Sequence, residues 1–289
     1  MKSQHLIVAE ELLPHLGEPD WAVVDCRFNL LAPDEGESQY FEAHLSGAVY
    51  AHLDRDLSGP RTGRNGRHPL PSVPEMAARF SRWGIDASVQ VVAYDADSGP
   101  MAARLWWMLR YFGHDRAAVL DGGMRGWRAA GLPTRAGREE RAPRSFTPRL
   151  RSSMRVEAAQ ILERAGSGIE VLVDARAPER FRGEEEPLDP VAGHIPGALN
   201  HFYHKNLDPQ GRLLSADALR EQFRALLGNA APESVVSYCG SGVTACHNLL
   251  AMEQAGLEGA RLYAGSWSEW CSDPSRPIER GATENRTKP

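Results

Sequence analysis

The fold of this chain is indicated by Ser234-Val-Val-Ser-Tyr-Cys239-Gly-Ser-Gly-Val-Thr244, a short Val-rich run followed by a loop that contains two glycines. A short apolar run bounded by polar residues is typical of a buried parallel strand. Residues 244–254 then carry apolar side chains three and four positions apart, which predicts a helix. The stretch therefore predicts a strand, a loop that begins at Cys239, and a helix.

The same kind of stretch occurs twice, because the two halves of the chain resemble each other. Trp21-Ala-Val-Val-Asp25 matches Glu170-Val-Leu-Val-Asp174, and His44-Leu-Ser-Gly-Ala48 matches His194-Ile-Pro-Gly-Ala198. Val91-Val-Ala-Tyr94 matches Val235-Val-Ser-Tyr238, and Gly122-Gly-Met-Arg-Gly-Trp127 matches Gly265-Ser-Trp-Ser-Glu-Trp270. The matches keep their order and nearly their spacing, so we infer that one domain has been duplicated.

Each half alternates between short strands and longer helices. The clearest predicted strands are residues 22–25, 89–93, 171–174 and 235–238, and the clearest helices are 74–83, 101–112, 215–227 and 244–254. Gly113 and Gly256 follow two of these helices, where a left-handed cap is expected. We predict an α/β protein of two tandem domains, each a parallel sheet with helices on both faces. Ligands of such sheets bind at the carboxyl ends of the strands.

The segment between the halves sets the expected domain boundaries. It is rich in arginine and contains Pro143 and Pro148. We expect a solvated linker over residues 135–155, between a domain at 1–134 and a domain at 156–289. A basic strip that binds a partner is the alternative for this segment.

Composition excludes several classes of protein. The chain has 289 residues, of which 42% are hydrophobic and 25% charged, and its formal net charge is −5. This is an ordinary globular balance, and a negative chain is a poor general binder of nucleic acid or anionic lipid. No apolar run is long enough to span a membrane, and the first residues do not form a signal-peptide core, so we expect a cytoplasmic protein. The four cysteines have no metal-ligand spacing and are expected to be thiols, with no metal site.

Cys239 is the residue that this context singles out for chemistry. Gly240 and Gly242 let the backbone curl so that successive amide N–H groups point inward, and the following helix adds positive potential at its N-terminus. Both effects favour the thiolate, which is the nucleophilic form of cysteine. Inert packing in the core is the alternative for a buried cysteine.

At these residues the chain resembles a known family. Cys239-Gly-Ser-Gly-Val-Thr-Ala245 is similar to the active loop of rhodanese-type sulfurtransferases, in particular the 3-mercaptopyruvate branch. Further matching landmarks are Asp174-Ala-Arg176, Arg180-Phe-Arg-Gly183, His194-Ile-Pro-Gly-Ala198 and Gly265-Ser-Trp-Ser-Glu-Trp270. Tandem members of that family have one active domain, the second. The corresponding loop of the first half, Asp95-Ala-Asp-Ser-Gly-Pro100, has no thiol, so that half is expected to be structural.

The resemblance implies a two-step sulfur transfer. The Cys239 thiolate takes a sulfur atom from a small anionic donor, 3-mercaptopyruvate or thiosulfate, and forms a persulfide that the loop amides stabilise. Cyanide or a thiol then accepts the sulfur, and a thioredoxin-like protein is one candidate acceptor. The resemblance implies no metal or organic cofactor, and from the charge and the short apolar runs we expect no nucleic-acid or membrane partner.

The resemblance also implies roles for individual residues. Arg182 matches the arginine that binds the donor, and Arg180 is expected to be an ordinary solvated residue. Ser241 is expected to relay a proton to the leaving enolate. His68 and Asp54, from the inactive domain, would complete this relay, with His52 as an alternative.

Four loop residues are expected to contact the donor. They are Gly240, Gly242, Val243 and Thr244, and Thr244 is also expected to cap the helix.

One departure bears on the choice of donor. Mercaptopyruvate enzymes carry a second arginine after a Glu-Pro step, but here Glu186-Pro-Leu188 places leucine at that position. Thiosulfate enzymes tend to have basic residues beside the cysteine, where this chain has Gly240 and Ser241. Mercaptopyruvate is therefore slightly favoured over thiosulfate.

Three other functions are alternatives for a chain with this cysteine loop. A cysteine phosphatase would need an arginine six residues after Cys239, where the chain has Ala245. A rhodanese-like module that only binds partners would not need an intact cysteine loop. A thiol redox sensor would need Cys246 to resolve an oxidised Cys239, although a regular helix would point Cys246 away from the loop.

Overall fold

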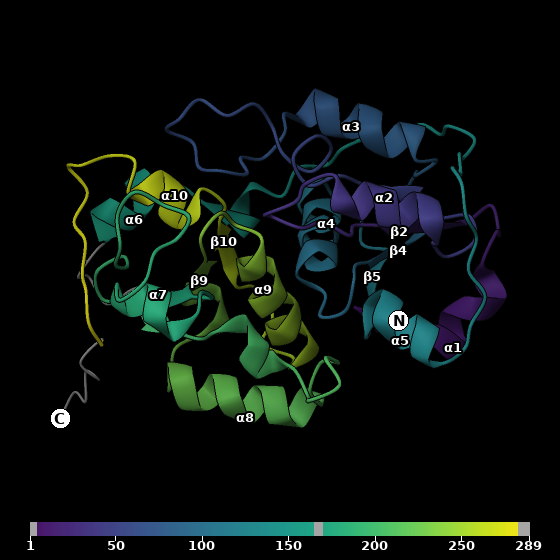
Figure 1. Ribbon diagram of the computed structural model, residues 1–289. Helices are drawn as coiled ribbons and strands as arrows, with labels where there is room; N and C mark the ends of the chain where they lie inside the picture. Colours follow the sequence, from purple (N-terminus) through teal and green to yellow (C-terminus); the bar gives the residue numbers. More distant parts are fainter. Residues whose placement is uncertain (1–4, 165–169, 283–289) are drawn as a thin grey trace. The chain divides into compact units, whose positions relative to one another are not determined.

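The computed structural model describes residues 5–164 and 170–282, which form two compact units (Figure 1). The N-terminal unit comprises the residues up to Pro60, Leu70–Ser152 and Leu207–Ser215. The C-terminal unit comprises Arg61–Pro69, Ser153–Asn206 and the residues from Ala216 onward. Two short segments thus pack with the opposite half of the sequence, and we call the first of them the 61–69 segment.

The described part of the N-terminal unit contains a five-stranded parallel sheet in the order β1-β5-β4-β2-β3. Its strands are β1 (Leu6–Ile7), β2 (Trp21–Asp25), β3 (Val49–Tyr50), β4 (Gln90–Tyr94) and β5 (Ala117–Leu120). Its helices are α1 (Ala9–Leu12), α2 (Glu35–Glu42), α3 (Val73–Arg82), α4 (Pro100–Tyr111) and α5 (Gly123–Ala129), with a 3₁₀ turn at Leu13–His15.

The described part of the C-terminal unit repeats this arrangement, with the parallel order β6-β10-β9-β7-β8. Its strands are β6 (Arg155–Val156), β7 (Val171–Asp174), β8 (Leu199–Asn200), β9 (Val235–Tyr238) and β10 (Arg261–Tyr263). Its helices are α6 (Ala158–Arg164), α7 (Pro178–Arg182), α8 (Ala216–Leu227), α9 (Thr244–Gln254) and α10 (Ser266–Trp270). Single 3₁₀ turns occur at Ser152–Met154, Tyr203–Asn206 and Pro232–Ser234.

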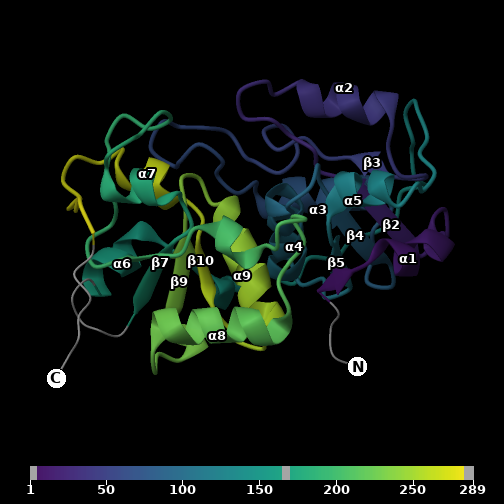
Figure 2. The ribbon, with the colours of Figure 1, turned by 60° about the horizontal axis from the view of Figure 1, so that its bottom comes forward.

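Each sheet is covered on both faces, as the Val-rich strands predict. Successive strand residues point to opposite faces. In the C-terminal unit, Val236 and Tyr238 join a buried cluster with Phe181 of α7 and Trp267 and Trp270 of α10. The other face is covered by α9, and α8 packs against α9 (Figure 2). This places the carboxyl end of β9 and the N-terminus of α9 at one edge of the sheet.

The predicted elements are confirmed to within about one residue at each end, as expected for strongly periodic segments. The predicted strand 22–25 is β2, and the predicted helix 101–112 is α4. Gly113 and Gly256 have φ of 92° and 73°, so both caps have the left-handed backbone that was expected.

The duplication extends to side-chain contacts. The Asp25 carboxylate accepts hydrogen bonds from the backbone and the guanidinium of Arg27, and Asp174 does the same for Arg176. Both carboxylates are fully buried at the ends of their strands. Each pair therefore fastens the chain where it leaves the sheet.

The arginine-rich segment after α5 lies along the N-terminal unit. Arg144, Arg149 and Arg151 donate backbone hydrogen bonds to α3, to Phe112 and to α4, and Phe146 is buried against Phe80. The domain boundaries predicted from this segment remain a prediction. Among the described residues, none of the helices combines the length and the apolar character that a membrane crossing requires.

Candidate active site around Cys239

Cys239 lies directly after β9, at the carboxyl end of the sheet in the C-terminal unit. Its sulfur atom accepts hydrogen bonds from two backbone amides, that of Gly242 at 3.1 Å and that of Ser241 at 3.5 Å. The residue is only 2% exposed. The amides come from the loop that leads into α9, so loop and helix N-terminus both direct positive potential at the sulfur.

The loop takes this shape because glycine is required at position 242. Gly242 has a φ of 78°, which is the left-handed region that side chains rarely adopt. A β-carbon at this position would lie 2.4 Å from the carbonyl oxygen of Ala264. Any other residue would have to move the backbone that carries the Gly242 amide.

The first turn of α10 holds the loop from the other side. The amides of Trp267 and Ser268 donate to the carbonyl oxygens of Cys239 and Gly240 at 2.9 and 3.0 Å. Because these carbonyls face α10, the amides of the loop are left to face the sulfur.

Ser266 also holds the loop, and sequence reasoning missed it. Its hydroxyl accepts the Cys239 amide at 3.1 Å and donates to the Tyr263 carbonyl at 2.9 Å. Its φ is 55°, the left-handed region, and no other non-glycine residue in the described ranges has positive φ. The matching position of the first half is Gly123, with a φ of 52°, so the replacement of that glycine by serine was the available signal.

Ser241 and His68 are brought together. The Ser241 hydroxyl and Nδ1 of His68 are 2.7 Å apart, and both residues are buried. His68 belongs to the 61–69 segment and therefore to the same unit as Cys239. Asp54 and His52 lie in the N-terminal unit, where the Asp54 amide donates to the His52 ring at 3.1 Å. A role for Asp54 or His52 beside His68 stays a prediction.

Two arginines of α7 have different surroundings. The guanidinium of Arg182 forms two 2.7 Å hydrogen bonds with Glu184 and lies 3.6 Å from Glu179. Arg180 forms ion pairs with Glu186 at 2.6 Å and Asp189 at 3.5 Å, and its side chain is 18% exposed. The expectation that Arg180 is an ordinary solvated residue is therefore wrong.

Arg180 is also one of two arginines that approach the cysteine loop. A β-carbon on Gly240 would lie 3.6 Å from each terminal nitrogen of Arg180 and 2.7 Å from one terminal nitrogen of Arg67. The lack of a side chain at Gly240 thus leaves room for both guanidinium groups beside the loop. The involvement of Arg180 and Arg67 was not predicted.

Of the remaining predictions for the loop, one is wrong and the others are not tested. Val243 occupies the N-cap position of α9 and makes no side-chain cap, whereas Thr244 is the first helical residue. The prediction that Thr244 caps the helix is therefore wrong, because the loop brings Val243 to that position. Contact of Val243 and Thr244 with a donor stays a prediction.

The other cysteines differ from Cys239 in their surroundings. Burial, and then the nearby Asp189 and Glu186, raise the pKa of Cys271 to about 11. Burial likewise raises the pKa of Cys26 well above its ordinary value. Cys246 donates through its sulfur to the Gly242 carbonyl oxygen at 3.3 Å. Within the described residues, no disulfide joins any of the four.

The matching loop of the N-terminal unit holds an aspartate side chain in place of the cysteine. Asp95, at the position of Cys239, accepts hydrogen bonds from the amides of Gly99 and Met101 at 2.9 Å and of Ala102 at 3.3 Å. Burial raises the pKa of this carboxyl to about 6, although these bonds oppose the rise. The amide-lined loop is thus present in both halves, but only the second presents a sulfur atom.

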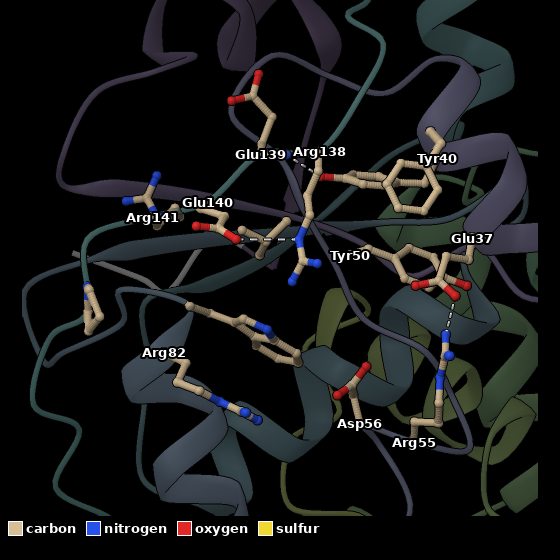
Figure 3. A pocket seen from close by; sticks show the side chains of 14 residues that line it. Glu37, Tyr40, Tyr50, Arg55, Asp56, Arg82, Arg138, Glu139, Glu140 and Arg141 are labelled. Atoms are coloured by element: carbon tan, nitrogen blue, oxygen red, sulfur yellow. Dashed lines mark hydrogen bonds and ion pairs between the residues drawn. The ribbon is translucent and has the colours of Figure 1, made fainter.

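A cavity of about 530 Å³ in the N-terminal unit is a separate feature. It lies between α2, β3, the end of α3 and residues 138–143, and Figure 3 shows Arg138 and Tyr50 pointing into it. Two of its cations are paired, Arg55 with Glu37 and Arg138 with Glu140. No cysteine is among the described residues that line it.

Comparisons with known proteins identify the family of the chain. The model of the rhodanese-like domain matches residues 8–130 and 157–273. The chain is 47% identical to a "Probable 3-mercaptopyruvate sulfurtransferase" of Pseudomonas aeruginosa, over 97% of this chain and 100% of that protein. It is 31% identical to "Thiosulfate/3-mercaptopyruvate sulfurtransferase 2" of Arabidopsis thaliana, over 96% and 86%. The crystal structure of the 3-mercaptopyruvate sulfurtransferase SseA from Escherichia coli matches with a TM-score of 0.80 and 28% identity, over 91% and 99%.

These matches cover both halves of the chain, including the half that contains Cys239 in its amide-lined loop. The chain therefore belongs to the rhodanese family, as a sulfurtransferase with two tandem rhodanese-like domains.

Proposed function

We propose that this sulfurtransferase uses 3-mercaptopyruvate as its preferred donor and Cys239 as its nucleophile. The observation that carries the proposal is the Cys239 sulfur, which accepts two loop amides beside the Ser241–His68 pair. The amides would stabilise a negative sulfur both in the thiolate and in the persulfide. The names of the P. aeruginosa and E. coli relatives support the same donor.

The reaction divides into two balanced steps. The Cys239 thiolate attacks the sulfur of mercaptopyruvate and forms an S–S bond, while the C–S bond breaks and its electron pair leaves on the pyruvate enolate. That enolate takes one proton and becomes pyruvate. The persulfide then loses its proton and gives its outer sulfur to cyanide, which yields thiocyanate, or to a thiol, and the Cys239 thiolate returns.

The Ser241–His68 pair supports mercaptopyruvate over thiosulfate. An enolate must be protonated as it leaves, whereas sulfite, the leaving group of thiosulfate, is stable as an anion. The hydroxyl 2.7 Å from the histidine ring can deliver that proton and take another from the ring. Thiosulfate remains the second candidate, because the A. thaliana relative is named for both donors.

We also propose Arg180, in place of Arg182, as the arginine that binds the anionic group of the donor. Both guanidinium groups are paired with carboxylates, but only that of Arg180 approaches Gly240 in the cysteine loop. The matched pair R180A and R182A removes the same charge from the same helix. We expect R180A to raise the KM for mercaptopyruvate and R182A to leave it near the wild-type value; the reverse result would restore Arg182.

The proposal also names a sulfur acceptor and a compartment. We propose a small thiol or a thioredoxin-like protein as the acceptor, because a persulfide exchanges directly with a thiolate. We propose the cytoplasm as the compartment, because the spacing of the four cysteines in the sequence predicts thiols.

The decisive experiment measures the intact mass of the protein after incubation with each donor. Wild-type protein should gain the mass of one sulfur atom and lose it again on addition of cyanide. C239S should gain none, whereas C246S, which alters the neighbouring cysteine, should gain it as the wild type does. The ratio of kcat/KM for mercaptopyruvate and thiosulfate then identifies the donor. Persulfide on C239S, or none on the wild type, would refute the proposal.

A further inference from the structure

Two guanidinium groups from distant parts of the chain meet over the residue that follows the nucleophile. Arg180 comes from α7, and Arg67 comes from the 61–69 segment, which packs in the same unit. One terminal nitrogen of Arg67 lies 2.7 Å from the place where a β-carbon of Gly240 would stand. The absence of a side chain at Gly240 therefore lets the Arg67 guanidinium reach the backbone of the cysteine loop.

Arg67 is held in this place by contacts at both ends of the residue. Its amide donates to the Ser268 hydroxyl at 3.0 Å, and one terminal nitrogen forms an ion pair with Asp189. The preceding Gly66 packs so closely that a β-carbon there would lie 2.7 Å from the Gly265 carbonyl oxygen. The Asp189 side chain is only 3% exposed, so the ion pair is largely shielded from solvent.

The arrangement leaves donors for an anion. Asp189 pairs with the first terminal nitrogen of Arg67, while it is the second that lies near Gly240. Arg180 also pairs with Asp189, so one carboxylate holds both guanidinium groups beside the loop. A guanidinium has five N–H donors in a planar fork that matches a carboxylate, and two such forks around one carboxylate can satisfy both of its oxygens.

We propose that Arg67 is a donor-binding residue, which with Arg180 forms a two-guanidinium clamp for the donor carboxylate. This inference rests on the proposed function of Cys239. Sequence comparison led us to expect a second cation at position 188, where the chain has an exposed leucine. Arg67 supplies a second cation from another segment, and Asp189 positions it.

The test compares R67A with R64A, which removes the same charge from an exposed arginine of the same segment. We expect R67A to raise the KM for mercaptopyruvate by about tenfold or more, as loss of a charge-assisted hydrogen bond does. Its kcat at saturating donor should change little. R67K, which keeps the charge but not the fork, should lie between R67A and the wild type. R64A should match the wild type.

A second readout uses pyruvate, which carries the carboxylate but no transferable sulfur. Pyruvate should protect Cys239 from alkylation by iodoacetamide in the wild type and in R64A, and R67A should need about tenfold more pyruvate for the same protection. This readout requires no turnover, so it tests the clamp even if the wild-type protein forms no persulfide. The lack of a persulfide would refute the proposed function but not the clamp.

Two results would overturn the clamp. One is unchanged KM and unchanged protection by pyruvate in R67A. The other is a loss of kcat with unchanged protection, which would mean that Arg67 only positions the adjacent His68. If R67A does not fold, R67Q keeps a side chain that can still donate to Asp189, and the same readouts apply to it.

Discussion

Substitution of Gly242 by alanine tests whether the shape of the loop creates the site. Gly242 has a φ of 78°, and its amide is the nearer of the two hydrogen-bond donors to the Cys239 sulfur. Forcing an alanine into the left-handed region costs about 1–2 kcal/mol. The new β-carbon would also lie 2.4 Å from the Ala264 carbonyl oxygen, and such overpacking costs a further 1–3 kcal/mol or so. We therefore expect G242A to destabilise the C-terminal unit by about 2–5 kcal/mol.

The matched control is G197A in the same unit. Gly197 has a φ of 75°, but nothing lies within 4 Å of the place where its β-carbon would stand. This variant should lose only the backbone contribution of about 1–2 kcal/mol. Thermal unfolding measures both variants, and the rate of Cys239 alkylation by iodoacetamide at pH 7 measures the reactivity of the thiol. We expect alkylation to slow in G242A and to stay at the wild-type rate in G197A.

The reasoning fails if G242A is no less stable than G197A, or if Cys239 in G242A reacts as fast as in the wild type. Either result would mean that the Gly242 amide is not held against the sulfur by the surrounding backbone.

Three further predictions follow from contacts described above. S241A and H68A should each lower kcat with mercaptopyruvate by about 10²–10⁴, and the double variant should be no slower than the worse single one; additive losses would show separate roles. Cys271, with its pKa near 11, should resist iodoacetamide at pH 8 and react above about pH 10, as peptide mass mapping can show. The raised pKa of Asp95 gives a stabilising contribution that is complete below about pH 3.8 and is lost as the pH rises through about 6. The Tm of the wild type relative to D95N should therefore fall between pH 4 and 7, and a constant difference would contradict the assigned burial.

The sheets and the position of Cys239 after a strand could be predicted because their signals are local. The local pattern around Cys239, a Val-rich strand followed by two glycines and a helix, leaves few alternative structures. The internal repeat supports each predicted element a second time. The buried aspartates at the strand ends were predictable for the same reason.

The arginines could not be predicted because their positions depend on tertiary packing. Arg180 and Arg182 are two residues apart on α7, so at 3.6 residues per turn they point in nearly opposite directions. Which direction faces Gly240 is decided by how the helix packs on the sheet. The position of Arg67 was harder still to predict, because it depends on the 61–69 segment packing with the opposite half of the sequence.

The role of Ser266 in holding the loop could be predicted only in part. Its replacement of a glycine is visible when the halves are aligned, but its φ of 55° and its bond to the Cys239 amide are visible only in three dimensions. Strained backbone of this kind is found where function requires it.

The Asp95 loop of the first half can serve as an internal control for the Cys239 loop of the second half. In the first half the loop amides hold a carboxyl group that is part of the polypeptide and is not transferred to another molecule. In the reaction proposed for the second half, Cys239 alternates between a thiolate and a persulfide during every turnover. The first loop therefore has no chemical event to respond to, so a spectroscopic label there should stay silent while the same label beside Cys239 reports each half-reaction.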